Sequence, residues 1–278
     1  MTMGKYIKMT MANPEHGQVN EDSVILGDSL MAVSDGAGGG GMYADKWSAH
    51  IVKSLPQEPI ESFGALDKWV GKMWEPFYNE YEQMAQDAGG LALQKFYDEG
   101  SFATLAAAWI DGDVCHWIAY GDSVVFHYQA ATGQLSHSFT YLCDFNRPPY
   151  LISLHDPLIK KAFRSGDYAL QAGDVVICAS DALAHYILMQ YELAHRDSNK
   201  KYSHDLDNAI AAGTSNSVHI MAAMAASSLD TDFGHDVIGK LVNCKGNEEA
   251  FRKHMESLLE EGLISLDDYS CTIYTHQP

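Results

Sequence analysis

Short apolar runs bounded by turn residues recur along the chain and predict β-strands. The first two runs lie on either side of Gly27-Asp28-Ser29 and form a predicted hairpin. Asp111-Gly112 and Gly121-Asp122-Ser123 supply tight turns between three further runs. Val175–Ala179 is wholly apolar, which is typical of a strand buried on both faces. The predicted strands are Ser23–Gly27, Leu30–Ser34, Ser101–Ile110, Val114–Tyr120, Val124–Gln129, Val175–Ala179 and Ser270–Tyr274.

Segments with helical periodicity lie between these strands. From Leu66 to Tyr81, apolar residues recur at i, i+3, i+4 and i+7, so one face of this helix is expected to pack on a sheet. Pro76 is expected to kink the same helix. The predicted helices are Met42–Leu55, Ala65–Ala88, Leu183–Arg196, Ala209–Ala226 and Glu248–Gly262. Strands with helices between them favour sheets that are covered by helices.

No internal repeat, low-complexity tract or Pro/Ser-rich linker divides the 278 residues. This length fits one large domain or two small ones, and the missing linker favours a single domain over residues 1–278. Ser136–Asp167 holds three prolines and is expected to be an irregular, loop-rich insertion.

The composition limits the kinds of partner. With 18 Lys and Arg against 37 Asp and Glu, the net charge is −19, which argues against nucleic acid and against an anionic membrane as partners. The five cysteines form no CxxC pair, so neither a disulfide framework nor a zinc ribbon is expected. The N-terminal residues 1–13 alternate polar and apolar positions and lack the apolar core of a signal peptide. We therefore expect a soluble protein of a reducing compartment, the cytoplasm.

Acidic residues stand repeatedly where a predicted strand meets a loop. For any one of them alone, a turn residue or a helix cap is the more frequent explanation. Their recurrence becomes informative if the carboxylates converge in space, which their spacing alone leaves open. The positions are Glu21-Asp22, Asp35, Asp122, Asp181 and Asp267-Asp268.

Carboxylates that converge repel one another and resist ionisation, and a shared divalent cation removes this penalty. A set of oxygen ligands without nitrogen or sulfur selects hard cations, Mg²⁺ or Mn²⁺, rather than Zn²⁺. The acidic positions therefore predict a magnesium or manganese site on condition that they meet.

At these residues the chain resembles the bacterial-type metal-dependent protein phosphatases, the protein phosphatase 2C-like (PPM) family. Six short motifs occur in the order of the family and extend over nearly the whole chain. In the third of them, Ala103 and Thr104 are exchanged relative to the family pattern. The matching segments are Asn20-Glu21-Asp22-Ser23, Ala32–Gly39 with its Asp35-Gly36-Ala37-Gly38-Gly39, Gly100–Thr104, Ala119–Ser123, Ala179–Leu183 and Asp267–Ser270.

The resemblance implies an α+β fold, a four-layer α-β-β-α sandwich of two central antiparallel β-sheets flanked by helices. It also implies two Mn²⁺ or Mg²⁺ ions between the sheets and a flap at about residues 136–170 beside them. Transferred to this sequence, Asp35 bridges the two ions, the Gly36 carbonyl ligates one, and Asp181 and Asp267 hold the other. Glu21 and Asp22 match acids that bind a metal or its waters, and Asp122 with Asp181 matches a weaker third site.

The implied activity is that of a serine/threonine phosphoprotein phosphatase. A water that bridges two cations loses its proton near neutral pH and attacks a phosphate monoester, while the cations stabilise charge on the phosphoryl oxygens. No phosphoenzyme is needed, so the cysteines are expected to be core or surface thiols. The implied partners are a phosphorylated protein as substrate and a cognate serine/threonine kinase, with neither nucleic acid nor membrane.

The chain departs from the family at the position of an arginine that binds the substrate phosphate, which is Gly17 here. Glycine cannot replace a bidentate guanidinium. Arg147 and Arg164, in or near the expected flap, are candidate substitutes, although basic residues in loops are more often solvated surface charges.

Three further positions bear on the site. Ala182 stands where the family has a glycine, and an alanine at this position requires a negative φ. Ala37 replaces a histidine of animal members, a candidate general acid. His185, one helical turn after Asp181, could orient a water or a further metal, although a histidine with a purely structural role is more frequent.

These departures leave two alternatives to a protein phosphatase. One is a catalytically weak or silent pseudophosphatase that acts as a binding module, suggested by Gly17 and Ala182. The other is a phosphoesterase that acts on a small molecule rather than on a protein.

Overall fold

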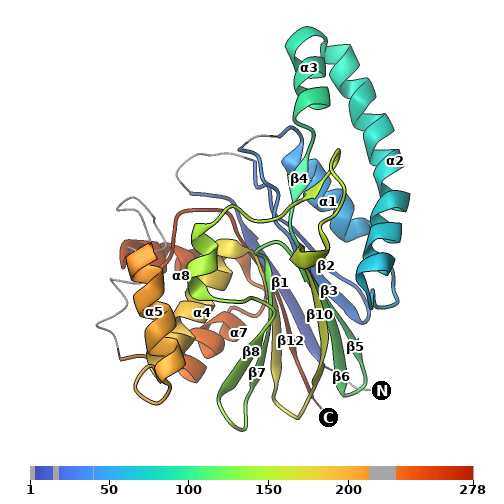
Figure 1. The fold of residues 1–278 in the computed structure, drawn as a ribbon. Helices are drawn as coiled ribbons and strands as arrows, with labels where there is room; N and C mark the ends of the chain where they lie inside the picture. The colour runs from blue at the N-terminus through green and yellow to red at the C-terminus, as the bar shows by residue number, and fades with distance from the viewer. Residues whose placement is uncertain (1–3, 15–18, 40, 213–229, 278) are drawn as a thin grey trace.

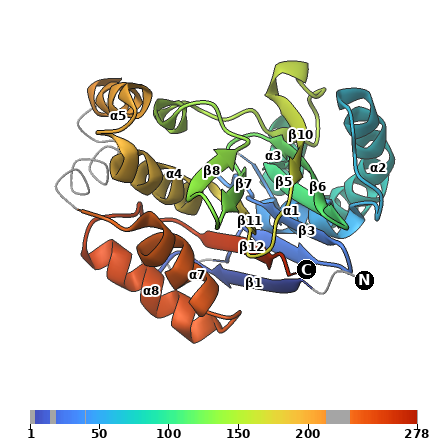
Figure 2. The same ribbon diagram turned by 90° about the horizontal axis from the view of Figure 1, so that it is seen from below.

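The protein is described here from a computed structural model, in which residues 4–14, 19–39, 41–212 and 230–277 are described. Two five-stranded antiparallel sheets pack face to face, and helices cover both outer faces (Figures 1 and 2). The predicted four-layer α+β sandwich is confirmed.

The first sheet has the strand order β1-β12-β11-β7-β8. Its central strand β11 pairs antiparallel with β12 on one side and with β7 on the other. The bounds are β1 Lys5–Met11, β7 Val124–Gln129, β8 Gln134–His137, β11 Val175–Ala179 and β12 Tyr269–Thr275.

The second sheet has the order β10-β6-β5-β3-β2, and a small pair, β4-β9, lies apart from both sheets. The predicted hairpin is confirmed, because β2 pairs with β3 antiparallel. The bounds are β2 Ser23–Leu26, β3 Leu30–Ser34, β5 Leu105–Asp111, β6 Val114–Tyr120 and β10 Phe163–Ala169, with β4 Phe102–Ala103 and β9 Ile152–Ser153.

One group of helices covers each sheet. Helices α1 and α2 lie on the second sheet, and α3 runs back along the far end of α2, which projects beyond the strands (Figure 1). Helices α4 and α8 lie on the first sheet together with the π-helix η3. The bounds are α1 Ala44–Ser54, α2 Phe63–Ala88, α3 Gly90–Asp98, α4 Asp181–His195, α5 Lys200–Ala212, η3 Phe233–Gly239, α7 Lys240–Asn243 and α8 Glu248–Glu260, and the short 3₁₀ turns are η1 Leu142–Asn146 and η2 Lys160–Ala162.

The alternation of side chains along the strands produces three apolar layers. On β3, Leu30 and Ala32 face the helices while Met31 and Val33 face the other sheet. The layer between the sheets is rich in small side chains, so the two sheets can approach closely. Its buried members are Met31, Val33, Ala106, Ala108, Ile110, Cys115, Val125, Leu170, Val176, Cys178 and Tyr274.

One expectation about the strands is wrong. Ser101–Ile110 is not one strand, because it breaks at Thr104 into β4, which pairs with β9, and β5, which joins the sheet. Gly121-Asp122-Ser123 is the expected tight turn between two strands, and these strands, β6 and β7, belong to different sheets. The turn carries the chain from one sheet to the other.

The stretch Ser136–Asp167 is less irregular than expected. It contains η1, β9 and η2, and its last residues begin strand β10, which pairs with β6 along its whole length. Phe163–Ala169 has a mixed polar composition because it is an edge strand with half-exposed side chains, so the apolar pattern was too weak to predict it.

Several elements were not predicted, and one prediction falls largely outside the described residues. Strand β1 forms where only alternation had been noted, and α3, α5 and η3 are additional helices. Beyond Ala212, the predicted helix Ala209–Ala226 lies outside the described residues. Pro76 lies inside α2, which runs on without a break from Phe63 to Ala88.

Two general expectations concern the cysteines and membrane spans. All five cysteines are free, and four of them are buried. In the part of the chain that the structure describes, no helix combines the length and the apolar character needed to span a bilayer.

A buried acid pair joins α4 to α5 and to the insertion. Glu192 and Asp205 are 4% and 5% exposed and share a side-chain hydrogen bond. Asp205 also accepts a hydrogen bond of 2.9 Å from the backbone N–H of Leu142, the first residue of η1. Burial and the charge of Asp205 raise the pKa of Glu192 to about 9, so Glu192 is the protonated partner near neutral pH.

We predict that Glu192→Gln stabilises the fold at alkaline pH. Because the pKa of Glu192 is raised from 4.5 to about 9, the folded state holds its proton more tightly than the unfolded state. The free energy of unfolding must therefore fall as pH rises through this window. Urea titrations at pH 5 and pH 8.5 should show the variant stabilised by roughly 1–3 kcal/mol at the higher pH only. Glu75→Gln, on the exposed face of α2, is the control, and an equal gain at both pH values would contradict the prediction.

Candidate metal centre

The acidic positions of the sequence meet at one edge of the two sheets. Asp35 follows β3, and Asp122 lies in the connection from β6 to β7. Asp181 is the first residue of α4, directly after β11, and Asp267 precedes β12. Asp22 precedes β2. Elements from both sheets therefore deliver their carboxylates to the same region.

The carboxyl groups of these residues lie close enough to shift one another's pKa. Burial raises the pKa of Asp35 well above its usual value, and the carboxylates of Asp22, Asp181, Asp122 and Asp267 raise it further. The pKa of Asp22 is also raised well above its usual value, by burial and by Asp268, although hydrogen bonds from Ser270 and Ser180 oppose the shift. Convergence, on which the sequence was silent, is thus present in the structure.

Two further members of the cluster have pKa values in the physiological range. Burial and the charge of Asp181 raise the pKa of Asp122 to about 8, against the opposing effect of Arg164. Desolvation of the carboxyl group and the charge of Asp181 raise the pKa of Asp267 to about 7. Burial is the larger cause of both shifts, and the neighbouring carboxylate of Asp181 adds to it, so the site disfavours several negative charges together.

Backbone N–H groups fix the acids at the rim of the cluster. Glu21 accepts a hydrogen bond of 2.9 Å from the N–H of Gly38. Asp268 accepts bonds of 2.7 Å each from the N–H groups of Glu21 and Asn13. Asp268 thus ties the entry to β12 to the segment before β2, a role that the Asp267-Asp268 pair in the sequence did not reveal.

Thr104 joins Asp35 to the connection that carries Asp122. Its backbone N–H donates to the Asp35 carbonyl at 2.8 Å, and its hydroxyl lies 3.3 Å from the Asp35 nitrogen and 2.5 Å from the Ser123 hydroxyl. This position is where strand Ser101–Ile110 breaks. The departure from the expected strand therefore serves to hold the site together.

Gly36 has no room for a side chain. A Cβ there would lie 2.6 Å from the backbone oxygens of both Ala44 and Glu21. The backbone after Asp35 thus passes between the start of α1 and the segment before β2. This close approach holds the Gly36 peptide beside the acidic cluster.

The chemistry of the donors fits a hard divalent cation. Oδ2 of Asp22 is buried without a hydrogen-bond partner, and an unpaired buried carboxylate oxygen is costly. The nearby donors are carboxylate and carbonyl oxygens, which suit Mg²⁺ and Mn²⁺. Within the described ranges, however, no three His, Cys, Asp or Glu side chains are arranged to hold a metal ion as they stand. Binding would require the carboxylates to turn toward a common ion.

The other positions singled out in the sequence have simple outcomes. Ala182 is buried in α4, and it is not among the described residues with positive φ, so the methyl group is accommodated. His185 is 2% exposed and packs edge-on against Phe145, 5.4 Å between ring centroids. Gly17 lies outside the described residues.

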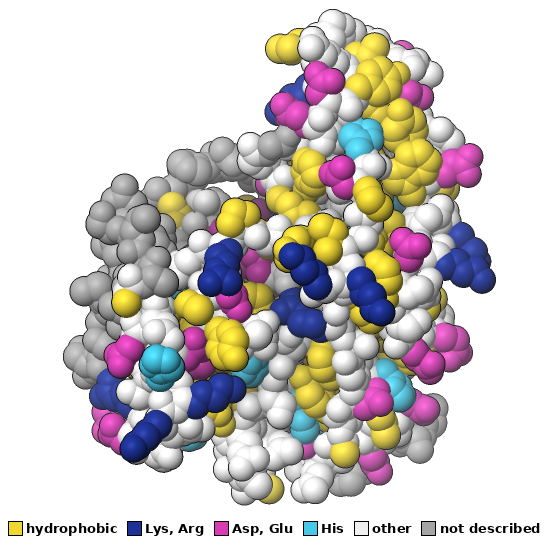
Figure 3. Space-filling view, in the orientation of Figure 1, with side chains coloured by type: hydrophobic (Ala, Val, Ile, Leu, Met, Phe, Trp, Pro, Cys, Tyr) yellow, Lys and Arg dark blue, Asp and Glu magenta, His cyan; other side chains and the backbone are white. Residues whose placement is uncertain are grey.

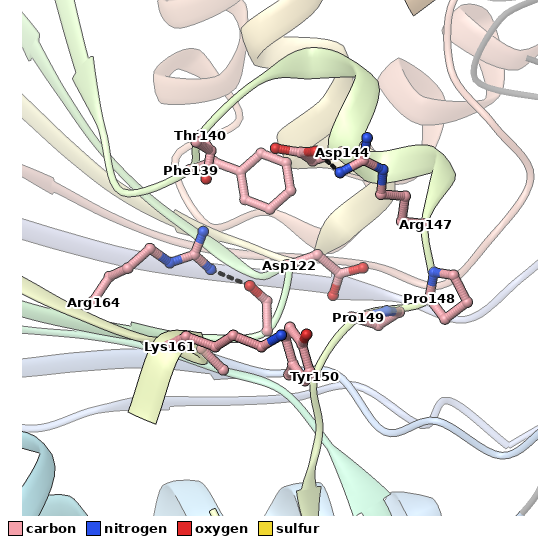
Figure 4. A pocket seen from close by; sticks show the side chains of 12 residues that line it. Asp122, Phe139, Thr140, Asp144, Arg147, Pro148, Pro149, Tyr150, Lys161 and Arg164 are labelled. Carbon is pink, nitrogen blue, oxygen red and sulfur yellow. Dashed lines mark hydrogen bonds and ion pairs between the residues drawn. The ribbon is translucent and has the colours of Figure 1, made fainter. Parts of the chain in front are cut away.

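A cavity of about 320 Å³ opens beside Asp122, and we call it the flap pocket. Its walls come from the turn at Asp122 and from the insertion (Figure 4). Both candidate arginines line it together with Lys161, which was not a candidate because a lysine in a loop is ordinary. The lining residues are Gly121, Asp122, Phe139, Thr140, Asp144, Arg147, Pro148, Pro149, Tyr150, Lys161, Ala162 and Arg164.

Solved structures of bacterial phosphatases share this fold. The catalytic domain of the serine/threonine protein phosphatase PstP in complex with two manganese ions is 16% identical with a TM-score of 0.54, and each chain is covered in full. Another structure, of the Mycobacterium tuberculosis phosphatase PstP/Ppp, is 15% identical with a TM-score of 0.54, and each chain is again covered in full. Stp1 from Staphylococcus aureus is 13% identical with a TM-score of 0.55. The match covers 100% of this chain and 96% of the Stp1 chain.

These similarities extend over the entire chain and show that it has the fold of these phosphatases. No protein-family model matches the sequence, and no curated protein matches it either. The similarity therefore lies in the arrangement of the helices and strands. At such low sequence identity it establishes the fold alone.

We predict that Mn²⁺ raises the melting temperature and that Asp35→Asn abolishes this response. A ligand at about 100 times its Kd stabilises by about 2.7 kcal/mol, which corresponds to roughly 5 °C or more for a chain of this size. In chelator the variant should melt higher than the wild type, because one of the mutually repelling carboxylates is gone. Differential scanning calorimetry tests both effects. Asp67→Asn, exposed on α2, should behave as wild type, and an intact Mn²⁺ response in Asp35→Asn would contradict the prediction.

Gly38→Ala should weaken the Mn²⁺ response without unfolding the protein. The added methyl group would overlap the Glu21 carboxylate, which must then leave the N–H of residue 38. Gly39→Ala is a closely matched control, because no atom of the described residues lies within 4 Å of a Cβ at Gly39. Calorimetric Mn²⁺ titration should show an affinity lowered severalfold for the first variant only. Equal affinities would indicate that Glu21 is irrelevant to the ion.

Proposed function

We propose that the chain is a metal-dependent serine/threonine protein phosphatase of the protein phosphatase 2C-like family, which hydrolyses phosphate monoesters with Mn²⁺ or Mg²⁺. The observation that carries this proposal is the convergence of Asp22, Asp35, Asp122, Asp181 and Asp267 at one edge of the sandwich. One protein of the same fold binds two manganese ions. A phosphoprotein substrate and a kinase that prepares it follow from the same proposal.

The acids have distinct places in this proposal. Asp35, between the other carboxylates, would bridge two ions, with the Gly36 carbonyl on one ion and Asp181 and Asp267 on the other. Asp122 would hold a third ion together with Asp181, while Glu21 and Asp22 would bind an ion or its waters. When bound, the ions activate a water and neutralise the phosphoryl oxygens.

The remaining residues of the site prepare this arrangement. The N–H of Gly38 orients the Glu21 carboxylate, and Asp268 holds the backbone of Glu21 in place. Thr104 fixes the backbone of Asp35 relative to the turn that carries Asp122. Catalysis of this kind depends on positions set before the substrate binds. Five free cysteines favour a reducing compartment, and we place the protein in the cytoplasm.

One observation still favours a catalytically silent binding module. Position 17 is a glycine, where the family has the arginine that binds the substrate phosphate. Incubation of the purified protein with p-nitrophenyl phosphate distinguishes an active phosphatase from a silent binding module. We expect turnover with Mn²⁺ and none in excess chelator. A wild type as inactive as Asp35→Ala, under conditions where Mn²⁺ still binds, would favour the binding module. Phosphopeptides compared with small phosphate esters then distinguish a protein phosphatase from a small-molecule phosphoesterase.

Asp181→Asn should lose metal affinity and rate together, because in this proposal one carboxylate serves both. A decrease of at least tenfold in Mn²⁺ affinity and of at least 100-fold in kcat is expected, on the order of other losses of charged ligands at catalytic centres. Calorimetric titration and p-nitrophenyl phosphate turnover at saturating Mn²⁺ measure the two effects separately. Unchanged affinity in the folded variant would remove Asp181 from the set of ligands.

A further inference from the structure

The flap pocket is a basic site on an acidic protein. The chain carries a net charge of −19, yet Arg147, Lys161 and Arg164 all line this one cavity. Lys and Arg side chains gather across the middle of the same face of the molecule (Figure 3). Two acids, Asp122 and Asp144, also line the cavity, so the cations outnumber the anions locally.

The three cationic side chains differ in the groups with which they already interact. Arg147 is paired with Asp144 at 3.1 Å. Arg164 donates to the Gly121 carbonyl, lies 5.2 Å above the Phe139 ring and offsets the charge of Asp122. Among the described residues, no Asp or Glu forms an ion pair with Lys161. Its ammonium group lies 4.7 Å from the centre of the Tyr150 ring, and the residue is exposed. Lys161 is therefore the cation best able to meet an incoming anion.

The shape of the pocket favours a peptide side chain over a bare ion. Its volume of about 320 Å³ is at the lower end for binding sites of small organic groups. Phe139, Pro148 and Tyr150 provide apolar wall beside the charges. Asp122 lines this pocket (Figure 4), and its pKa is raised by burial and by the charges of Asp181 and Asp267, so it belongs to the acidic cluster as well. A substrate whose phosphate lies at the cluster would therefore have its neighbouring residues at this pocket.

We propose that the flap pocket binds an acidic side chain close to the phosphorylated residue of the substrate, with Lys161 as its main contact and Arg164 supporting the charge behind it. This inference rests on the proposed phosphatase function and adds a substrate preference to it. A carboxylate is favoured over a second phosphate because Asp122 and Asp144 share the cavity and repel a dianion more strongly.

The test uses phosphoserine peptides that carry Glu, Gln or Lys at each of three positions on either side of the phosphoserine. For the wild type with Mn²⁺, kcat/KM should be about two- to fivefold higher for Glu than for Gln at one position at least, the size expected for a solvent-exposed ion pair. Lys161→Gln should bring this ratio to about one, and Lys161→Glu should reverse it in favour of Lys peptides. Lys160→Gln removes a charge of the same kind from the adjacent residue, which does not line the pocket, and should keep the wild-type ratio.

The outcomes separate the inference from the function on which it rests. Turnover of p-nitrophenyl phosphate and of the peptides without any preference for Glu would overturn the inference alone. Absence of all metal-dependent turnover would overturn the proposed function and the inference with it. A peptide with a second phosphoserine in place of Glu, if preferred over Glu by more than tenfold, would overturn the assignment to a carboxylate. Equal ratios in Lys161→Glu and wild type, with matching circular dichroism spectra, would also overturn it.

Discussion

The mutual repulsion of carboxylates at one edge of the sandwich is the constraint around which the molecule is organised. Bringing Asp22, Asp35, Asp122 and Asp181 within reach of each other's charge costs free energy, which the rest of the fold must supply. Burial of the apolar layer between the sheets contributes part of that free energy and holds both sheets in a fixed relation. A cluster of this kind is stable only on a frame that cannot relax by moving its elements apart.

Two features of the chain connect this frame to the cluster. The tight turn at Asp122 passes from one sheet to the other, so the same three residues join the layers and present an acid. Thr104 interrupts a strand and binds both the backbone of Asp35 and the hydroxyl of Ser123. These two local irregularities both lie at the edge where the acids of the two sheets meet.

The sequence predicted best those elements whose hydrophobic pattern was set by burial on two sides. Leu30–Ser34 and Val175–Ala179 have the predicted bounds, because they are buried along their whole length and carry a nearly continuous apolar signal. Strand β10 was missed because an edge strand with half-exposed residues carries little pattern. The turn at Asp122 was identified as tight, yet no local pattern distinguishes a hairpin from a passage between sheets. In the site, the acids were identified by motif, while Asp268 and Thr104 act through backbone contacts that depend on distant segments.

The distribution of charge follows from the same constraint. An edge that gathers so many acids repels anions at a distance, and the net charge of the chain strengthens that repulsion. Cations can offset it only if they stand beside the cluster without neutralising it, which the insertion allows because it reaches the edge from outside the sheets. Arg164 donates to the Gly121 carbonyl and its charge lowers the pKa of Asp122, whereas Lys161 lies on η2 against Tyr150. The insertion thereby separates two tasks, since the inner cation moderates the acidic cluster and the outer one remains available to whatever approaches it.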